Sequence, residues 1–156
     1  MAGLTPGTKA PAFHCIGGDG RKYSLKDFKG RTIVLFFYPE DDTSVCTREA
    51  CAFRDRSAEF RELGVELIGV SPDQPESHRA FSSKYGLDYL LLSDPDMTMM
   101  KQYGVWGKKV MFGHRFMGVI RTTVIIDGSG TVTHYFPRVR VNGHAERVLA
   151  AVKENR

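Results

Sequence analysis

The sequence predicts an α/β protein in which a central mixed β-sheet is flanked by helices. The first observation is a continuous β-branched and aromatic run from Thr32 to Tyr38, typical of a strand buried on both faces. The second is the alternation of such runs with helix-like segments, which favours parallel strands joined by helical crossovers. The third is a change after Gly104, where two strand-like segments flank a glycine-rich turn and predict an antiparallel hairpin.

The segments before Gly104 are delimited by proline and glycine. Pro39 ends the first long strand because proline cannot donate a hydrogen bond to the sheet. A polar loop over 40–44 follows. The remaining expected elements are a short first strand over 13–17, a helix over 45–63 stopped by Gly64, a strand over 65–70, a helix over 76–85 closed by Gly86, an apolar strand-like piece over 89–92 and a short helix over 97–103.

The last part of the chain predicts two strands and a helix. The strands cover 119–126 and 132–136, and the turn 127–130 joins them. An amphipathic helix over 144–153 follows. Parallel crossovers, then an antiparallel hairpin and a final helix, give a thioredoxin-like fold. No repeat or linker interrupts this order, so residues 1–156 are predicted to form a single domain.

Composition excludes several classes of protein. The net charge of +4 comes from 22 basic and 18 acidic residues spread along the chain, which does not indicate nucleic-acid binding. No apolar run is long enough for a membrane span, and residues 1–13 do not resemble a signal peptide, so we expect a cytoplasmic protein without membrane association. Three cysteines, an odd number, favour reactive or buried thiols over a disulfide framework.

Cys46 is the candidate nucleophile. It lies in the first turn of the helix predicted over 45–63, where unpaired N–H groups and the helix dipole stabilise a thiolate. Thr43, three residues earlier, is placed to direct its hydroxyl toward whatever Cys46 attacks.

Cys51 follows Cys46 by five residues on the same predicted helix. In an intact helix the two Cα atoms would be roughly 8–9 Å apart, whereas a disulfide usually needs less than about 7 Å. Either the pair never bonds, or the start of the helix unwinds when it does. Two cysteines at this spacing are, without context, most often small buried residues. A zinc site lacks a compact second pair of ligands.

The segment from Pro39 to Cys51 resembles the active site of the peroxiredoxins. Their pattern P-x-x-x-T-x-x-C is carried here by Pro39, Thr43 and Cys46. The chain is similar in particular to the bacterioferritin-comigratory, or peroxiredoxin Q, subgroup, whose resolving cysteine matches Cys51. Further matching segments occur at 7–13, 36–39, 53–55, 69–71, 93–95, 103–107, 121–123 and 126–127.

This resemblance implies a thiol-dependent peroxidase acting on hydrogen peroxide and organic hydroperoxides. Cys46 would be the peroxidatic residue that becomes a sulfenic acid, and Cys51 the resolving residue that forms an intramolecular disulfide with it. Thioredoxin or a similar dithiol would reduce that disulfide, and no cofactor or metal would be needed. Because the resolving thiol is in the same chain, a monomer is expected.

The resemblance also assigns Arg121 and Pro39. Arg121 matches the family's active-site arginine, expected to favour the Cys46 thiolate and to polarise the peroxide. The alternative is an arginine at a strand edge that faces solvent. Pro39 would shield the thiolate from water. Ser44 and Val45 depart from the Pro-Gly pair of many subgroup members, which affects loop stiffness or substrate access and leaves the chemistry unchanged.

Other residues leave alternatives open. Glu49 either bonds to Arg121 or faces water, and Cys15 is expected to be a non-catalytic thiol. One group of apolar residues is expected to form a collar near the active site or, alternatively, a self-association surface: Tyr103, Trp106, Met111, Phe112 and Phe116. Two competing functions are a disulfide reductase, disfavoured because the motif is C-x₄-C and not C-x-x-C, and a redox-sensing or holdase module.

Overall fold

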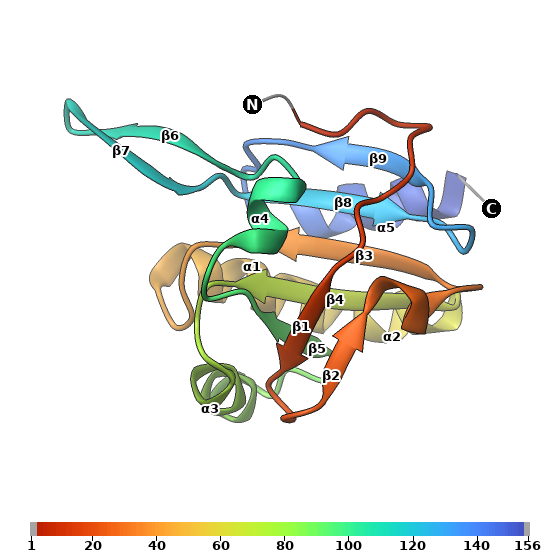
Figure 1. Cartoon of the computed structure of the whole chain (residues 1–156). Helices are drawn as coiled ribbons and strands as arrows, with labels where there is room; N and C mark the ends of the chain where they lie inside the picture. The colour runs from red at the N-terminus through yellow and green to blue at the C-terminus, as the bar shows by residue number, and fades with distance from the viewer. Residues whose placement is uncertain (1–2, 155–156) are drawn as a thin grey trace.

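A seven-stranded mixed sheet forms the centre of the computed structural model, which describes residues 3–154 (Figure 1). The strand order is β2-β1-β5-β4-β3-β8-β9. The strands are β1 (His14–Gly17), β2 (Lys22–Ser24), β3 (Thr32–Phe37), β4 (Val65–Ser71), β5 (Leu90–Ser93), β8 (Thr122–Ile126) and β9 (Val132–Phe136). β3, β4 and β5 pair in parallel, and the remaining neighbours pair antiparallel. The predicted fold class is therefore confirmed.

Helices cover both faces of this sheet. They are α1 (Ser44–Asp55), α2 (Ser57–Glu62), α3 (Pro75–Tyr85), α4 (Thr98–Gln102), α5 (His144–Glu154) and the 3₁₀ helix η1 (Leu25–Phe28). In the view of Figure 1, α1, α2 and α5 lie behind the sheet and α4 lies in front of it. No helix within residues 3–154 is long and apolar enough to cross a membrane.

Strand β3 separates two hydrophobic cores. Val34 and Phe36 face the core beneath α1, α2 and α5, whereas Ile33, Leu35 and Phe37 face the core beneath α4. All five side chains are buried, as expected for a central strand with both faces covered. The next residues of the chain therefore leave the sheet from a rigid central position, and they lead directly into α1.

The helix expected over 45–63 is interrupted at Arg56. This residue has φ −107° and ψ 3°, so α1 ends and α2 begins around it. Both Phe53 and Phe60 remain fully buried across the bend, with their ring centroids 6.1 Å apart. Beside the bend, the buried Ser57 donates its hydroxyl hydrogen to the Asp88 carboxylate over 2.9 Å.

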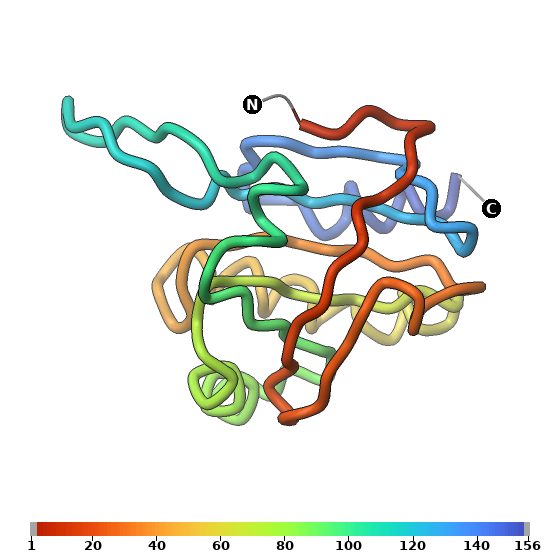
Figure 2. The backbone as a smooth tube through the Cα atoms, viewed as in Figure 1, coloured from red at the N-terminus to blue at the C-terminus, as the bar shows by residue number. Residues whose placement is uncertain are grey.

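A β-hairpin that the sequence pattern did not indicate projects from the molecule. Strands β6 (Trp106–Met111) and β7 (His114–Val119) form a separate two-stranded sheet, and Figure 2 shows the chain running outward and back. Phe112 and Gly113 form the tip, with φ of 52° and 78°, the positive values that a tight hairpin turn requires. The strand expected over 119–126 is β8, but it begins only at Thr122, because Val119 is instead the last residue of β7.

We expect Phe53→Ala to destabilise the protein by about 3–5 kcal/mol, because it leaves a cavity in a packed core. Phe53 is fully buried, and its ring stacks on Phe36 at a centroid distance of 4.6 Å. The matched control is Phe112→Ala at the hairpin tip, where the side chain is 93% exposed, and its effect should stay within about 0.5 kcal/mol. Urea unfolding of both variants measures the difference, and equal losses would contradict this description of the core.

Candidate active site

Cys46 lies where the chain enters α1 from the end of β3. Thr43 is extended, with φ −93° and ψ 159°, and precedes the first helical residue. The first backbone bond of the helix runs from the Thr47 N–H to the Thr43 carbonyl over 2.8 Å. Cys46 precedes Thr47, so its own N–H is among those that have no acceptor within the helix. The predicted position of Cys46 in a helical first turn is confirmed by this geometry.

Arg121 connects Cys46 to Glu49. It lies between β7 and β8, and its Nη2 donates to the Cys46 Sγ over 3.2 Å. Its Nη1 donates to the Glu49 Oε1 over 2.6 Å. The Arg121 side chain is only 14% exposed and that of Glu49 only 1%. Two alternatives from the sequence are therefore wrong: Arg121 does not face solvent, and Glu49 does not face water.

Burial and the neighbouring charges have opposite effects on the pKa values of Arg121 and Glu49. Burial lowers the pKa of Arg121, but the nearby Glu49 and Cys46 outweigh it and hold that pKa above its ordinary value. Burial raises the pKa of Glu49 to about 7, although Arg121 acts in the opposite direction. Among residues 3–154 the Glu49 Oε2 has no hydrogen-bond partner. The guanidinium thus stays charged beside the sulfur, while Glu49 titrates near neutrality.

Lys109 on β6 reaches back to the base of the β6–β7 hairpin. The Lys109 Nζ donates to the Val119 carbonyl over 2.8 Å. Burial lowers the pKa of Lys109, the Arg121 charge lowers it further, and Cys46 acts in the opposite direction. The Lys109 side chain thus bonds to a backbone carbonyl of the hairpin and not to a carboxylate.

Thr43 and Pro39 precede Cys46 in the sequence, and among residues 3–154 neither side chain is hydrogen-bonded to it. The Thr43 hydroxyl donates to the Glu40 carbonyl over 2.9 Å, so its hydrogen is engaged and its lone pairs are available as acceptors. Pro39 is half-buried and follows β3 after one intervening residue, Tyr38. The expected action of the Thr43 hydroxyl on the substrate stays a prediction, and in this geometry the hydroxyl is free to accept a hydrogen bond.

Cys51 and Cys15 occupy different surroundings. Cys51 is half-buried within the same unbroken helix as Cys46, and both are free thiols. Cys15 is on β1 in the opposite core, where burial first, and then Asp94 and Asp96, raise its pKa to about 12. A thiol that stays protonated on the other face of the sheet agrees with the non-catalytic role expected for Cys15.

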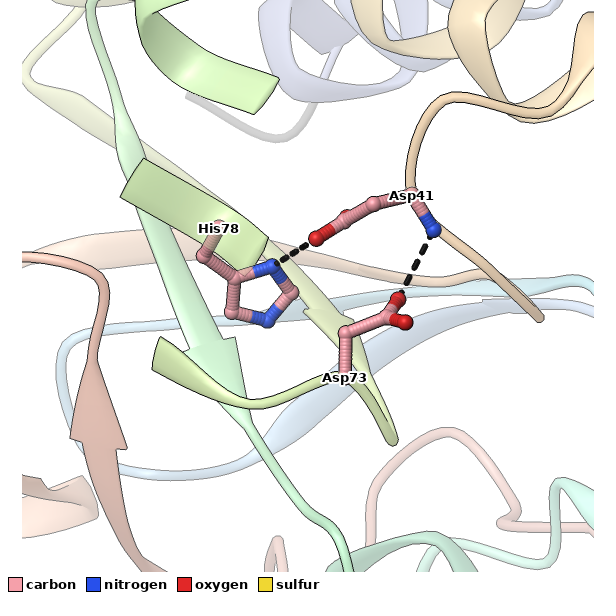
Figure 3. Close-up of side chains that lie close together, drawn as sticks. All are labelled: Asp41, Asp73 and His78. Carbon is pink, nitrogen blue, oxygen red and sulfur yellow. Dashed lines mark hydrogen bonds and ion pairs between the residues drawn. The ribbon is translucent and has the colours of Figure 1, made fainter. Parts of the chain in front are cut away.

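A buried network fixes the loop before α1, and sequence reasoning did not find it (Figure 3). The Asp41 carboxylate accepts from the Tyr38 hydroxyl over 2.6 Å and contacts the His78 Nδ1 over 2.7 Å. The Asp41 backbone N–H donates to the Asp73 carboxylate over 2.7 Å. The His78 Nε2 is bonded to the Leu92 carbonyl over 2.9 Å. A metal ion at Asp41, Asp73 and His78 would have to displace these bonds, so the cluster is structural.

The expected collar of aromatic residues does not form as one group. Tyr103 is fully buried beneath the sheet, while Met111 and Phe112 are 53% and 93% exposed at the end of the hairpin. Their exposure follows from the hairpin, which carries them away from the body of the protein. The collar is therefore a wrong interpretation for Met111 and Phe112.

Fold and site together define a thiol-dependent peroxidase: a thioredoxin-like sheet that presents a buried cysteine beside an arginine at the start of a helix. The comparisons with known proteins agree. The model of the AhpC/TSA family matches residues 6–135. The chain belongs to this family and is a peroxiredoxin of the bacterioferritin-comigratory, or peroxiredoxin Q, type, an enzyme that uses a peroxide substrate and a thiol reductant.

Relatives of the same type cover nearly the whole chain. The putative peroxiredoxin bcp of Coxiella burnetii is 43% identical over 92% of this chain and 95% of its own length. Peroxiredoxin Bcp of Bacillus subtilis is 41% identical over 95% and 94%. Peroxiredoxin Bcp of Escherichia coli K12 is 37% identical over 99% of both chains.

Solved structures show the same architecture. The bacterioferritin comigratory protein of Xanthomonas campestris is 32% identical, with a TM-score of 0.90 over 97% of this chain and 99% of its own. Peroxidoxin BcpB of Mycobacterium tuberculosis is 33% identical, with a TM-score of 0.87 over 98% and 99%. Both similarities extend beyond the site to the whole sheet and its helices.

We expect Glu49→Gln to flatten the pH dependence of stability between pH 4.5 and 7. The Glu49 pKa rises from 4.5 to about 7 on folding, so its stabilising contribution is full below pH 4.5 and is lost as the pH rises through 7. At about 1.4 kcal/mol per pKa unit, this is on the order of 3 kcal/mol.

The free energy of unfolding at pH 4.5, 5.5, 6.5 and 7.5 measures this loss in both proteins. His144 acts in the opposite direction, because burial lowers its pKa from 6.5 to about 4 and its contribution is lost as the pH falls through that range. Since His144 is present in both proteins, its effect cancels in the difference. Parallel pH profiles would refute the titration of Glu49.

Proposed function

We propose that the protein reduces hydrogen peroxide and organic hydroperoxides through a Cys46 sulfenic acid and an intramolecular Cys46–Cys51 disulfide, and that thioredoxin or a similar dithiol recycles it. The observation that carries this proposal is the 3.2 Å contact between the Arg121 guanidinium and a Cys46 sulfur that is almost fully buried. No other thiol among the described residues has a cation bonded to it.

In the first step the Cys46 thiolate attacks one oxygen of the peroxide. The S–O bond forms as the O–O bond breaks, and the leaving oxygen takes up a proton and departs as water or an alcohol. The Arg121 guanidinium and the unpaired Cys46 N–H are both fixed before the substrate arrives. They therefore stabilise the charge that moves onto the oxygens without reorganisation at the moment of reaction.

Thr43 and Pro39 orient and protect the substrate. The Thr43 hydroxyl gives its hydrogen to Glu40, so it accepts the hydrogen of the peroxide and turns the O–O bond toward Cys46. Pro39 offers no N–H group and covers the sulfur on the side of the preceding loop. Both roles favour the reaction of Cys46 with a peroxide held in the site over its reaction with other electrophiles in solution.

In the second step the Cys51 thiol displaces water from the sulfenic acid and forms the disulfide. The two residues are in one continuous helix, so its first turn unwinds for the sulfurs to meet. In the third step an external dithiol attacks the disulfide, and both cysteines return to the thiol form as the dithiol is oxidised.

Organic hydroperoxides belong in the proposed substrate range because the similar Xanthomonas campestris protein has alkyl peroxide reduction activity. We further propose that the protein acts as a single-domain monomer, because both cysteines of the cycle are in one helix. Three free cysteines suit the reducing conditions of the cytoplasm, where we place it.

We expect Cys46→Ser to abolish the reaction with hydrogen peroxide, since the hydroxyl lacks a nucleophilic thiolate. Cys51→Ser should consume one equivalent and then stop as the sulfenic acid, because no second thiol is available in the helix. Stopped-flow mixing of the reduced proteins with peroxide, followed by mass spectrometry, measures both results. Cys15→Ser is the matched control and should turn over like the wild type. Peroxide consumption by Cys46→Ser at the wild-type rate would sink the proposal.

We expect Arg121→Gln to slow the oxidation of Cys46 about 100-fold, the usual loss when one fixed donor to a developing charge is removed. Arg31→Gln is the control, since Arg31 forms an exposed ion pair with Glu66 at the other end of β3. The second-order rate constant with hydrogen peroxide measures both. If Arg121→Gln reacts within about threefold of the wild type, the guanidinium does not act on the substrate.

A further inference from the structure

The β6–β7 hairpin carries most of the exposed apolar side chains of the protein. Within residues 3–154, β6 and β7 pair only with each other, and the hairpin projects from the body of the protein (Figure 2). Two exposed large apolar residues of this part of the chain lie elsewhere, Ile16 on β1 and Val45 on α1. Those on the hairpin are Val110, Met111, Phe112, Phe116 and Met117. A cluster of this kind indicates a contact site.

Apolar side chains lie on both faces of the hairpin and at its tip. Residues directly opposite each other in an antiparallel pair point to the same face, and the next pair points to the other face. Met117 is opposite Lys108, whereas Phe116 is opposite Lys109, so the two apolar residues lie on different faces. Phe112, at the tip, is 93% exposed. A flat protein surface covers only one face of a hairpin, so an occupant that contacts all of these side chains has to surround the tip.

The charged side chains of the hairpin are all basic. Lys108 and Lys109 are on β6 and Arg115 is on β7, while the sequence from 97 to 126 contains no aspartate or glutamate. In the described part of the chain, none of these three residues forms a salt bridge. The cations therefore complement an anionic surface and not a mixed or acidic partner patch on this protein.

The tip holds an aromatic side chain in a conformation that costs free energy. Phe112 has φ of 52°, and a tight hairpin turn of this kind usually carries asparagine, aspartate or glycine at such a position. Backbone strain of this kind is concentrated at sites that serve a function. A two-stranded sheet is in addition only marginally stable alone in water. Transfer of the tip into an apolar environment offsets both costs, because it buries the exposed ring.

We propose that the tip of the hairpin docks on an anionic lipid surface, with Met111 and Phe112 among the acyl chains and Lys108 and Arg115 at the phosphate groups. Arg115 and Lys108 are three and four residues from Phe112, or roughly 10–13 Å along the strands, just above an interfacial insertion depth of about 5–10 Å. Deeper insertion is disfavoured, because the outer edges of both strands carry backbone groups that hydrocarbon does not satisfy. The inference does not depend on the proposed function.

This proposal differs from the expectation of no membrane association, because that expectation concerns segments that span a bilayer. A peripheral contact needs no spanning segment. It combines a few inserted apolar side chains with the attraction between cations and anionic lipids, and it weakens as salt screens that attraction. Contact of this kind is reversible.

The first test compares vesicles of phosphatidylcholine alone with vesicles that contain an equal part of phosphatidylglycerol. In co-sedimentation, the wild type should bind the anionic vesicles and not the neutral ones, and added salt should release it. We expect Phe112→Ser to lower the partition coefficient at least about tenfold, because the inserted ring is lost. The matched control is Ile16→Ser, an exposed apolar residue on β1, whose partition should stay within about twofold of the wild type.

The second test removes charge. We expect Lys108→Gln/Arg115→Gln to lower the partition coefficient at least about tenfold, since each cation near an anionic surface contributes about fivefold. The matched control is Lys22→Gln/Lys26→Gln, which removes the same net charge at β2 and η1. It should bind like the wild type. Each variant should keep the wild-type circular dichroism spectrum, because the exchanged side chains are exposed.

The third test reports insertion of the tip itself. The chain has one tryptophan, so Trp106→Phe/Phe112→Trp moves the only indole to the tip. Its emission should shift to the blue with anionic vesicles and should be quenched by lipids that are brominated on the acyl chains. Neutral vesicles should leave both properties unchanged.

Four outcomes would overturn the inference. Phe112→Ser that binds like the wild type, or a tip tryptophan that brominated lipids do not quench, would show that the tip is not inserted. An equal loss in the lysine control would show that net charge alone adsorbs the protein. A wild-type dimer that Phe112→Ser converts to a monomer, without binding to vesicles, would show that the hairpin docks on a second copy of the chain.

Discussion

The ion pair between Arg121 and Glu49 determines how the active site is built. A guanidinium that is mostly removed from water needs a carboxylate or a thiolate beside it, and here it contacts both Glu49 and Cys46. Arg121 reaches them from the short break between β7 and β8. Its backbone carbonyl is held there by the Val139 N–H over 2.9 Å.

The position of β3 in the sheet explains where the cysteine lies. β3 is hydrogen-bonded on both sides, to β4 and to β8, so its end is fixed in space. Residues that follow such a strand and begin a helix expose unpaired N–H groups at one edge of the sheet. The same edge receives Arg121 from the antiparallel neighbour β8, which brings a distant cation to the helix start.

Local patterns predicted most of the central fold. The buried runs of β3 and β4 and the helix closed by Gly86 were found because their signals are short-range: β-branched residues, and a glycine with φ of 62° at the helix end. The hairpin was missed because its strands are half exposed or fully exposed up to the buried Val119 and carry no alternation of buried and exposed residues. The bend at Arg56 does not change the spacing of the apolar residues on its two sides, so their helical periodicity does not reveal it.

The site itself was only partly predictable. Cys46 follows from its place in a helical first turn, but its contact with Arg121 joins residues 75 positions apart and came only from the family resemblance. The bonds of Asp41 to Tyr38 and His78 depend on side chains from three elements meeting in the core, and no spacing in the sequence signals them.

The anchoring of the loop before α1 decides which part of the chain is able to move. Asp41 is held by the buried network, and Asp42 is bonded to the Tyr85 hydroxyl over 2.7 Å and to Lys84 over 2.8 Å, both on α3. The free tether from Asp42 to Cys46 is about four residues, or roughly 13–14 Å when extended. In the proposed mechanism this segment is the part that moves, because the two cysteines are roughly 8–9 Å apart in an intact helix. The unwinding that the proposed disulfide needs is therefore confined to residues after Asp42, while the sheet, α3 and the anchored part of the loop stay in place.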